Sequence, residues 1–315
     1  MSDFAPRPKP TVHAALLVVQ IAFASQAVEG KLLMAPVDHG GEAFPPVALT
    51  LVRMIGASFA FTIFSALDGR RALVKENRAR EPLVLRDHLT LVGLSLLGVT
   101  INQTLFLLGL TRTSSVTATL LSVAIPVFTA GLSVLLGQER LSLRIALGLG
   151  CAAAGVVTLT GVARPDLGAI LVTLNSLSYS LYLVLSRKTL ARLGVFRTLS
   201  WLFLWGVVAL APFGTVPLVH ALGAASSRAL FLVAFIVLVP TILAYLCNAW
   251  ALVRSTPALV TSYIFLQPPL AAILAYVQLG QTLSPKLLVA APLIVIGVLL
   301  AAYRGRARVV PARAG

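Results

Sequence analysis

The chain has 315 residues, of which 58% are hydrophobic and 11% are charged, with 25 Lys and Arg against 10 Asp and Glu. A soluble domain carries about 25% charged residues, so the composition argues against a soluble enzyme, a disordered chain and a disulfide-rich secreted domain. Apolar stretches of about 20 residues recur along the whole chain, and each is long enough to cross a bilayer as a helix. The composition therefore predicts an all-helical (all-α) polytopic membrane protein.

Ten transmembrane helices are predicted in chain order, each from one apolar stretch. They cover Thr11–Met34, Pro45–Leu67, His88–Leu110, Val116–Leu136, Leu143–Val162, Leu167–Arg187, Thr198–His220, Ala229–Val253, Pro257–Leu279 and Lys286–Tyr303. Residues 1–10 and 304–315 are left as tails, and the second of them is basic.

Lys and Arg gather on one side of these spans. With the N-terminus in the cytoplasm, 19 of the 25 Lys and Arg fall on the cytoplasmic side, 5 fall outside, and Arg53 lies within the second span. Because cytoplasmic loops carry an excess of Lys and Arg, we predict an inner (plasma) membrane protein with both termini in the cytoplasm. The positive charge thus reports topology, and the lipid bilayer rather than nucleic acid is the expected partner.

The chain offers little for covalent or metal chemistry. His13, His39, His88 and His220 lie at span ends or in loops, and the sequence contains neither Gly-x-Ser-x-Gly nor His-Glu-x-x-His. No cofactor and no metal is predicted, and an intramembrane enzyme is disfavoured because such an enzyme needs a nucleophile and a base at matching depth.

An internal repeat appears when the chain is shifted by 142 residues against itself. Arg112 then meets Arg254, Pro126 meets Pro268, and Gly155 meets Gly297. Each unit holds five spans, an odd number, so the two halves, 11–162 and 163–303, are predicted to cross the membrane in opposite senses. Inverted repeats of this kind give many secondary transporters two related open states around one central site.

At residues 12–303 the sequence resembles the EamA-type transporters of the drug/metabolite transporter superfamily. The elements that carry this resemblance are Gly30-Lys31, Arg53, Leu110-Thr111-Arg112-Thr113 before Pro126, Gly137-Gln138-Glu139-Arg140-Leu141-Ser142, Arg254-Ser255 before Pro268, and Gly280-Gln281-Thr282-Leu283-Ser284. The resemblance implies ten helices in two five-helix halves that move metabolites and often export amino acids. Gln281 departs from the family pattern, which usually has an acidic residue there.

Charged residues inside the spans are functional candidates because burying them is costly. Glu29 is the only carboxylate within a predicted apolar span, and it serves either ion coupling or a structural role at the outer rim. Arg53 either pairs with Glu29 or recognises an anionic group of the substrate.

Proline residues near the middle of the fourth and ninth spans are predicted to break those helices. Pro126, Pro268 and Pro269 each remove a backbone donor. The breaks either line a central cavity, where irregular backbone is tolerated, or only bend the helices for packing.

A set of amide, phenol and hydroxyl side chains at helical spacing completes the candidate substrate site. Its members, besides Arg53, are Gln20, Asn102, Gln103, Asn175, Tyr179, Tyr182, Tyr245, Asn248, Tyr263 and Gln267, with Gln26, Thr119 and Ser122 as weaker candidates. Gln103 and Tyr245 occupy equivalent positions in the two halves.

These observations favour a secondary transporter, most simply an exporter of a small metabolite. An amino acid or related zwitterion fits better than a polyamine, because a dication would need carboxylates that the spans lack. A channel or lipid scramblase is the alternative. Small residues at Gly148, Ala152, Gly155, Gly297 and Ala301 allow close helix packing, either within one chain or in a homodimer.

Overall fold

The protein is described by a computed structural model that covers residues 9–76, 81–136, 166–255 and 257–280, with isolated positions at 143, 147, 150, 151, 154, 289, 292, 293 and 296. All regular structure within these residues is helical. Eight of the described helical segments are long and apolar enough to cross a membrane. The all-helical, multi-span prediction is therefore confirmed. The predicted spans Leu143–Val162 and Lys286–Tyr303 lie outside the described residues and stay predictions.

The observed helices follow the eight other predicted spans closely. In chain order they are α1 Pro10–Met34, η1 Val37–His39, α2 Pro46–Glu76, α3 Leu85–Ser95, η2 Leu96–Thr100, α4 Ile101–Arg112, α5 Ser115–Ser122, α6 Ile125–Leu135, α8 Leu167–Leu193, α9 Val195–Gly223, α10 Ser227–Val237, η3 Leu238–Leu243, α11 Ala244–Arg254, α12 Pro257–Ser262, η4 Tyr263–Leu266 and α13 Gln267–Leu279. The largest difference is at α2, which continues from the predicted end at Leu67 to Glu76.

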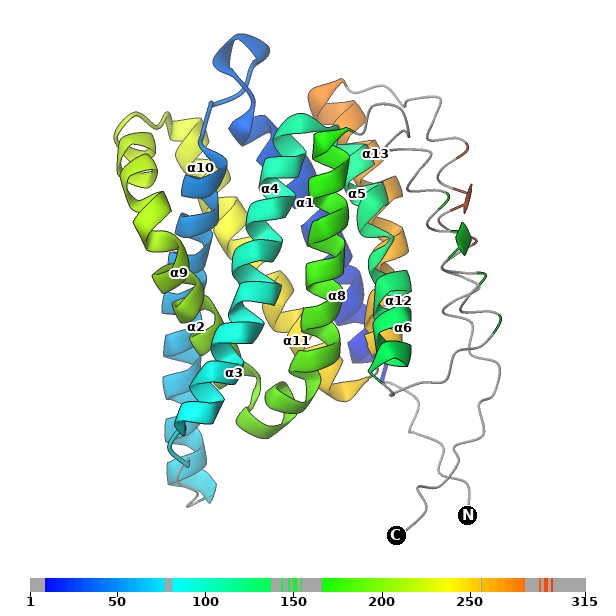
Figure 1. Cartoon of the computed structure of the whole chain (residues 1–315). Coiled ribbons are helices and arrows are strands. Elements are labelled where there is room, and N and C mark those ends of the chain that lie inside the picture. Colours follow the sequence, from blue (N-terminus) through cyan, green and yellow to red (C-terminus); the bar gives the residue numbers. More distant parts are fainter. Residues whose placement is uncertain are drawn as a thin grey trace.

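The helices form an upright bundle in which two groups run in opposite senses (Figure 1). We call the end at which α1 begins the lower end. The first group rises with α1, descends with α2, rises with α3 and α4, and descends with α5 and α6 (Figure 1). The second group descends with α8, rises with α9, descends with α10 and α11, and rises with α12 and α13 (Figure 1). Corresponding helices of the two groups are thus antiparallel.

The second helices of the two groups, α2 and α9, pack against each other. The rings of Phe61 and Phe203 stack with centroids 5.6 Å apart, and the hydroxyls of Thr62 and Ser200 are 2.9 Å apart. Phe61 and Phe203 differ by the same 142 residues that relate the two halves of the sequence. Equivalent residues therefore meet where the two groups join.

Departures from regular α-helix also recur at this spacing. The π-wound turns η2 and η3 begin at Leu96 and Leu238, which are 142 residues apart. The fourth span is interrupted at Val123 and Ala124 between α5 and α6, and the ninth contains the 3₁₀ turn η4 between α12 and α13. Pro126 and Pro268 then lie in the first turn of α6 and α13, where a missing backbone N–H costs nothing.

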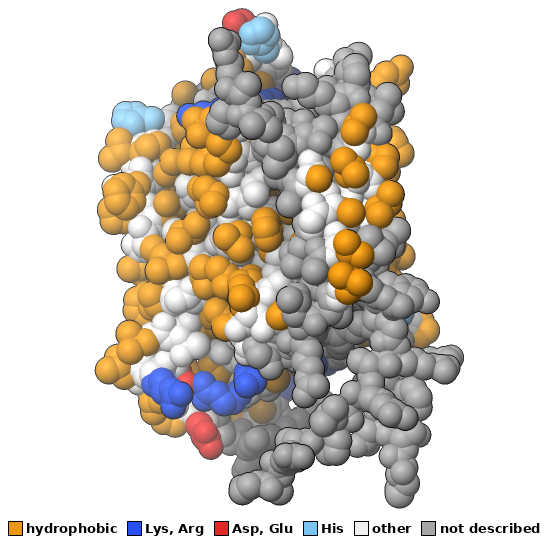
Figure 2. Space-filling model, turned by 45° about the vertical axis from the view of Figure 1, so that its right-hand side comes forward, with side chains coloured by type: hydrophobic (Ala, Val, Ile, Leu, Met, Phe, Trp, Pro, Cys, Tyr) orange, Lys and Arg blue, Asp and Glu red, His pale blue; other side chains and the backbone are white. Residues whose placement is uncertain are grey.

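The outer surface matches a lipid environment in its middle and water at its lower end. Figure 2 shows hydrophobic side chains over most of the height of this face and a row of Lys and Arg side chains near its lower end. Large apolar side chains such as Phe59, Phe213 and Phe231 are about 70% exposed, as expected for groups that face lipid tails rather than water.

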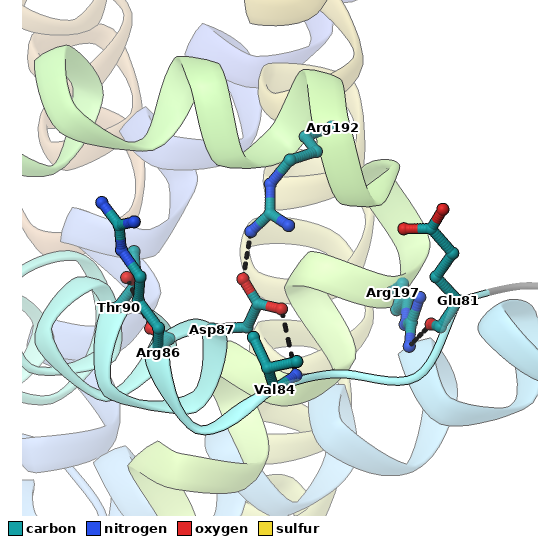
Figure 3. Close-up of polar contacts among 7 residues, drawn as sticks. All are labelled: Glu81, Val84, Arg86, Asp87, Thr90, Arg192 and Arg197. Carbon is teal, nitrogen blue, oxygen red and sulfur yellow. Dashed lines mark hydrogen bonds and ion pairs between the residues drawn. The ribbon is translucent and has the colours of Figure 1, made fainter.

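An ion pair ties the two groups together at the lower end (Figure 3). Asp87, in the first turn of α3, pairs with Arg192 near the end of α8 and also accepts a 3.2 Å hydrogen bond from the backbone N–H of Val84. Next to it, Arg197 of α9 donates to the carbonyl of Glu81 at 2.8 Å (Figure 3). The sequence had suggested no role for Asp87, which lies one residue before a predicted span.

Replacing Asp87 and replacing Arg192 are expected to lower the stability of the protein by different amounts. The Asp87 side chain is 8% exposed and that of Arg192 is 58% exposed, so Arg192→Gln leaves a buried carboxylate without its cation, whereas Asp87→Asn leaves an arginine that water can solvate. We expect Arg192→Gln to lower the thermal midpoint of the detergent-solubilised protein more than Asp87→Asn does. Equal shifts, or the reverse order, would show that the pair contributes as a surface contact only.

Candidate functional site

A cavity lies within the bundle and is lined by both groups of helices. Its walls combine apolar and polar side chains: Val19, Gln20, Phe23, Gln26, Arg53, Asn102, Gln103, Phe106, Ser122, Ile125, Asn175, Tyr179, Leu183, Tyr245, Asn248, Val260, Ile264 and Gln267. Arg53 is the only charged residue among them.

Most of the candidates from the sequence reach this cavity. Nine of them line it: Gln20, Arg53, Asn102, Gln103, Asn175, Tyr179, Tyr245, Asn248 and Gln267. They come from six helices, so the bundle gathers polar groups that lie far apart along the chain. Whether they bind a substrate stays a proposal.

Tyr182 and Tyr263 are not brought to the cavity walls. Tyr182 is one turn beyond Tyr179 on α8, stacks on its ring with centroids 5.8 Å apart, and fills the space above Gly98, where an added Cβ would lie 2.3 Å from Tyr182 Cδ2. Tyr263 is hydrogen-bonded through its hydroxyl to Nδ1 of His13. Both tyrosines therefore contact neighbouring helices and are not among the residues that line the cavity.

Arg53 is buried, with 1% of its surface exposed, and is held by neutral partners. Its Nε donates to Thr241 Oγ1 at 2.8 Å and its Nη2 donates to Gln26 Oε1 at 2.9 Å. Thr241 in turn donates to the carbonyl of Ile236 at 2.7 Å, so its oxygen is available to accept from the arginine. Nη1 is buried and finds no acceptor among the described residues.

Glu29 neither lines the cavity nor pairs with Arg53 among the described contacts. It is partly exposed, two turns along α1 from the cavity residue Gln20 and one turn from Gln26. Its neighbour Lys31 donates to the carbonyls of Leu110 and Thr113 at 2.8 and 2.9 Å, which caps the end of α4. The predicted alternative in which Arg53 pairs with Glu29 is therefore not found among the described contacts.

Gln103 and Tyr245, the equivalent residues of the two halves, are bonded to each other. Gln103 Nε2 donates to the Tyr245 hydroxyl at 3.1 Å, and that hydroxyl donates to the carbonyl of Gly98 at 3.0 Å. A phenol has a single proton, so its oxygen must accept from Gln103. The Oε1 atom of Gln103 is therefore turned elsewhere, and it is buried without a described donor.

The remaining amides pair across neighbouring helices. Asn102 Nδ2 donates to the carbonyl of Asn175 at 3.3 Å, and Asn175 Nδ2 donates back to the carbonyl of Asn102 at 2.8 Å, which joins α4 to α8. Asn248 Nδ2 donates to the Tyr179 hydroxyl at 2.7 Å. Gln267 Nε2 and Gln20 Oε1 are 2.7 Å apart and join α13 to α1. Each of these four amides donates one of its two N–H groups to the protein.

The helix interruptions border the same space. Ser122 and Ile125 flank the first interruption, Ile264 lies in the second, and all three line the cavity. The hydroxyls of Ser176 and Ser180 on α8 lie 3.3 and 3.0 Å from the carbonyl oxygens of Leu121 and Ile125, so α8 contacts the backbone at the first interruption. Pro126, Pro268 and Pro269 themselves do not line the cavity.

Reasoning from the sequence missed the apolar part of the wall and the partner of Arg53. Phe23, Phe106 and Leu183 line the cavity, but in a membrane span an apolar side chain gives no signal that separates cavity from lipid. Thr241 lies outside the cavity wall and could not be singled out among many hydroxyls. Within the described residues no group of three His, Cys, Asp or Glu side chains is placed to hold a metal ion.

Comparisons with known proteins identify the family. The description "EamA-like transporter family" matches the chain twice, at residues 13–161 and 166–303. A protein of Streptantibioticus cattleyicolor described as a "Probable terminal-alkyne amino-acid exporter" is 27% identical over 265 residues, which cover 83% of this chain and 85% of that protein. One solved crystal structure has a TM-score of 0.60 at 19% identity and covers 93% of this chain and 96% of its own, which indicates a shared fold.

The eight apolar helices and these matches describe an integral, multi-pass membrane protein. The family description matches nearly the whole chain, in two consecutive segments of similar length. The chain belongs to the EamA-like transporter family.

Proposed function

We propose that the protein is a secondary transporter that exports an amino acid or related zwitterion across the inner membrane by alternating access. The observation that carries this proposal is the position of the cavity, which is lined by residues of both antiparallel groups. In an inverted repeat each group can adopt the conformation of the other, which closes one end of the site as it opens the other. On this proposal residues 11–162 and 163–303 are the two repeats, each with five helices.

The paired irregularities support this mechanism. The π-wound turns and the interrupted helices occupy equivalent places in both groups, and Ser122, Ile125 and Ile264 at the interruptions line the cavity. Such segments bend more easily than regular helix because fewer backbone hydrogen bonds tie adjacent turns together. A rocking motion of one group against the other would therefore concentrate its bending next to the bound substrate.

The walls of the cavity support a substrate that carries a carboxylate. Arg53 is a buried cation with an uncommitted nitrogen, and no Asp or Glu lines the cavity among the described residues. A buried cation with neutral partners is most readily stabilised by a bound anion. The relative named as an amino-acid exporter supports the same class of substrate and the outward direction.

The charge distribution supports an orientation with the lower end in the cytoplasm. The described Arg residues 70, 71, 86, 187, 192, 197 and 254 lie towards the lower ends of their helices, whereas Lys31, Arg112 and Arg228 lie towards the upper ends. The positive-inside rule then places the lower end, and with it the proposed tails, in the cytoplasm.

Counterflow in proteoliposomes tests the proposal. Vesicles loaded with an unlabelled amino acid should take up the labelled compound transiently above equilibrium, because a carrier exchanges substrate through a saturable site. The panel includes amino acids, nucleosides and sugars. A linear, unsaturable flux or lipid exchange between leaflets would instead indicate a channel or a scramblase, and no counterflow with any compound would overturn the proposal.

Glu29 is proposed as the proton-coupling carboxylate. We expect Glu29→Gln to abolish accumulation of substrate driven by an imposed pH gradient, because a glutamine cannot bind and release a proton. Counterflow, which needs no gradient, should persist in this variant. Glu42→Gln is the matched control, since Glu42 lies in the loop before α2 and bonds Ser226 at 2.6 Å. Gradient-driven accumulation at the wild-type rate in Glu29→Gln would reject the coupling role.

A further inference from the structure

Two buried atoms on the cavity residues are left without partners among the described residues, and they are of opposite kind. Arg53 Nη1 is a charged donor, and Gln103 Oε1 is an acceptor. Of the buried side-chain atoms without a partner in the described part of the chain, only these two belong to cavity-lining residues. Leaving a buried polar atom unpaired is costly, and more so for a charged group. A ligand that pairs both atoms recovers that cost.

Neither atom can find a partner by a simple rotation of its own side chain. The guanidinium of Arg53 is fixed at Nε by Thr241 and at Nη2 by Gln26. The amide of Gln103 is fixed because the Tyr245 hydroxyl spends its proton on Gly98 and must accept from Nε2. The donor and the acceptor are thus held ready before any ligand arrives, which lowers the entropy cost of binding.

Other acceptors lie beside Gln103 in the same wall. Asn102 and Asn175 each direct their NH₂ group to a backbone carbonyl, which can only accept, so the orientation of both amides is determined. No described residue donates to their Oδ1 atoms. Around α4 and α8 the cavity therefore has amide oxygens without a described donor, whereas Arg53 on α2 is the only cation among the described lining residues.

Apolar side chains make up a further part of the lining. Val19, Phe23, Phe106, Ile125, Leu183, Val260 and Ile264 come from α1, α4, α6, α8, α12 and η4. These seven groups provide no partner for a second charge on a ligand, so a charged side chain placed against them would be buried without compensation.

We infer that the cavity binds the α-carboxylate of a neutral amino acid at Arg53 Nη1, its ammonium at Gln103 Oε1 with the neighbouring amide oxygens, and its apolar side chain against the aliphatic and aromatic wall. This inference rests on the proposed transport function and narrows its substrate class. Basic amino acids are disfavoured because no described lining residue is a carboxylate, and acidic ones because a single arginine serves a single carboxylate.

The test uses three probes of one carbon skeleton with the purified full-length protein in lipid nanodiscs. They are L-leucine, 4-methylpentanoate, which lacks the ammonium, and 3-methylbutylamine, which lacks the carboxylate. L-lysine and L-glutamate are measured separately as amino acids with a charged side chain. We expect L-leucine to bind at least about tenfold more tightly than each of the other four, because each lost charged hydrogen bond is worth about 1.5–3 kcal/mol. Binding of 4-methylpentanoate as tight as that of L-leucine would overturn the ammonium site.

Gln103→Met removes the acceptor at nearly constant volume. In this variant L-leucine and 4-methylpentanoate should bind within about twofold of each other, since the ammonium has lost its fixed partner. Thr104→Val is the matched control on the next residue of α4, which does not line the cavity, and should keep the wild-type preference. An unchanged preference in Gln103→Met would overturn the assignment of Gln103.

The binding series and the counterflow assay distinguish failure of the zwitterion site from failure of the transport function. Counterflow of another compound in the panel, together with no preference for L-leucine among these probes, would overturn the zwitterion site and leave the transporter intact. Absence of counterflow with every compound would overturn the proposed function itself. The wild-type binding series does not depend on any variant, so a variant that fails to fold leaves the test decisive.

Discussion

Arg53→Gln is expected to reduce counterflow of a carboxylate-bearing substrate by roughly 10- to 100-fold, which corresponds to the loss of one charge-assisted hydrogen bond. Arg53 is the only charged residue among the described residues that line the cavity, and it is buried with Nη1 unpaired among the described residues. Glutamine can still reach one of the two neutral partners, Thr241 or Gln26, but it brings no charge to the substrate. The effect should appear as a raised half-saturation concentration in proteoliposomes.

Arg53→Lys separates charge from geometry. Lysine keeps the cation but lacks the planar fork that bonds Thr241 and Gln26 at 2.8 and 2.9 Å. We expect an activity between those of the wild type and Arg53→Gln. Arg112→Gln is the control, because Arg112 is exposed and, among the described residues, donates to the carbonyl of Leu108 on its own helix. Full activity in Arg53→Gln would mean that the arginine serves the fold alone and that the substrate binds elsewhere.

Gly109→Ala is expected to lower stability by about 1–3 kcal/mol through overpacking. An added Cβ at Gly109 would lie 2.7 Å from Val172 Cγ2 and 2.9 Å from the carbonyl oxygen of Gly168, so α4 and α8 would have to move apart. Separation of these helices would also strain the reciprocal bonds between Asn102 and Asn175 in the cavity wall. Loss of activity and a lower thermal midpoint should therefore go together.

Gly93→Ala provides a control of the opposite sign on the same span. Gly93 lies in α3 with nothing within 4 Å of an added Cβ, and alanine is favoured over glycine in a helix by about 1 kcal/mol. The thermal midpoint in detergent should rise for Gly93→Ala and fall for Gly109→Ala. A neutral or stabilising Gly109→Ala would show that the contact between α4 and α8 can relax without cost.

The positions of the spans could be predicted from the sequence because a lipid bilayer imposes a simple condition on any segment that crosses it. A crossing segment must be apolar for about 20 residues and must satisfy its backbone internally, so hydropathy alone locates it. The ninth predicted span is an example: its helices α12 and α13 begin at Pro257 and end at Leu279, as hydropathy predicts. The extension of α2 to Glu76 was missed because a helix that leaves the membrane becomes polar while its backbone hydrogen bonds continue.

The candidate site was only partly readable. Gln103 and Tyr245 could be matched through the 142-residue shift, and polar residues in spans are few enough to draw attention. Tyr182 and Tyr263 looked the same as Tyr179 in the sequence, yet one packs on Gly98 and the other bonds His13. The ion pair of Asp87 with Arg192 joins residues 105 positions apart and has no local pattern.

The sequence by itself determined an all-helical membrane protein and supplied the polar groups, because the length and polarity of each segment are local properties that a bilayer reads directly. Only the tertiary structure decided which of those groups meet. The direction of a side chain depends on how its helix is rotated against its neighbours, and the pairing of Arg53 with Thr241, rather than with Glu29, depends on contacts 188 residues apart in the chain. Hydropathy contains no term for either quantity, so the arrangement of donors and acceptors around the cavity appears only once the helices are packed.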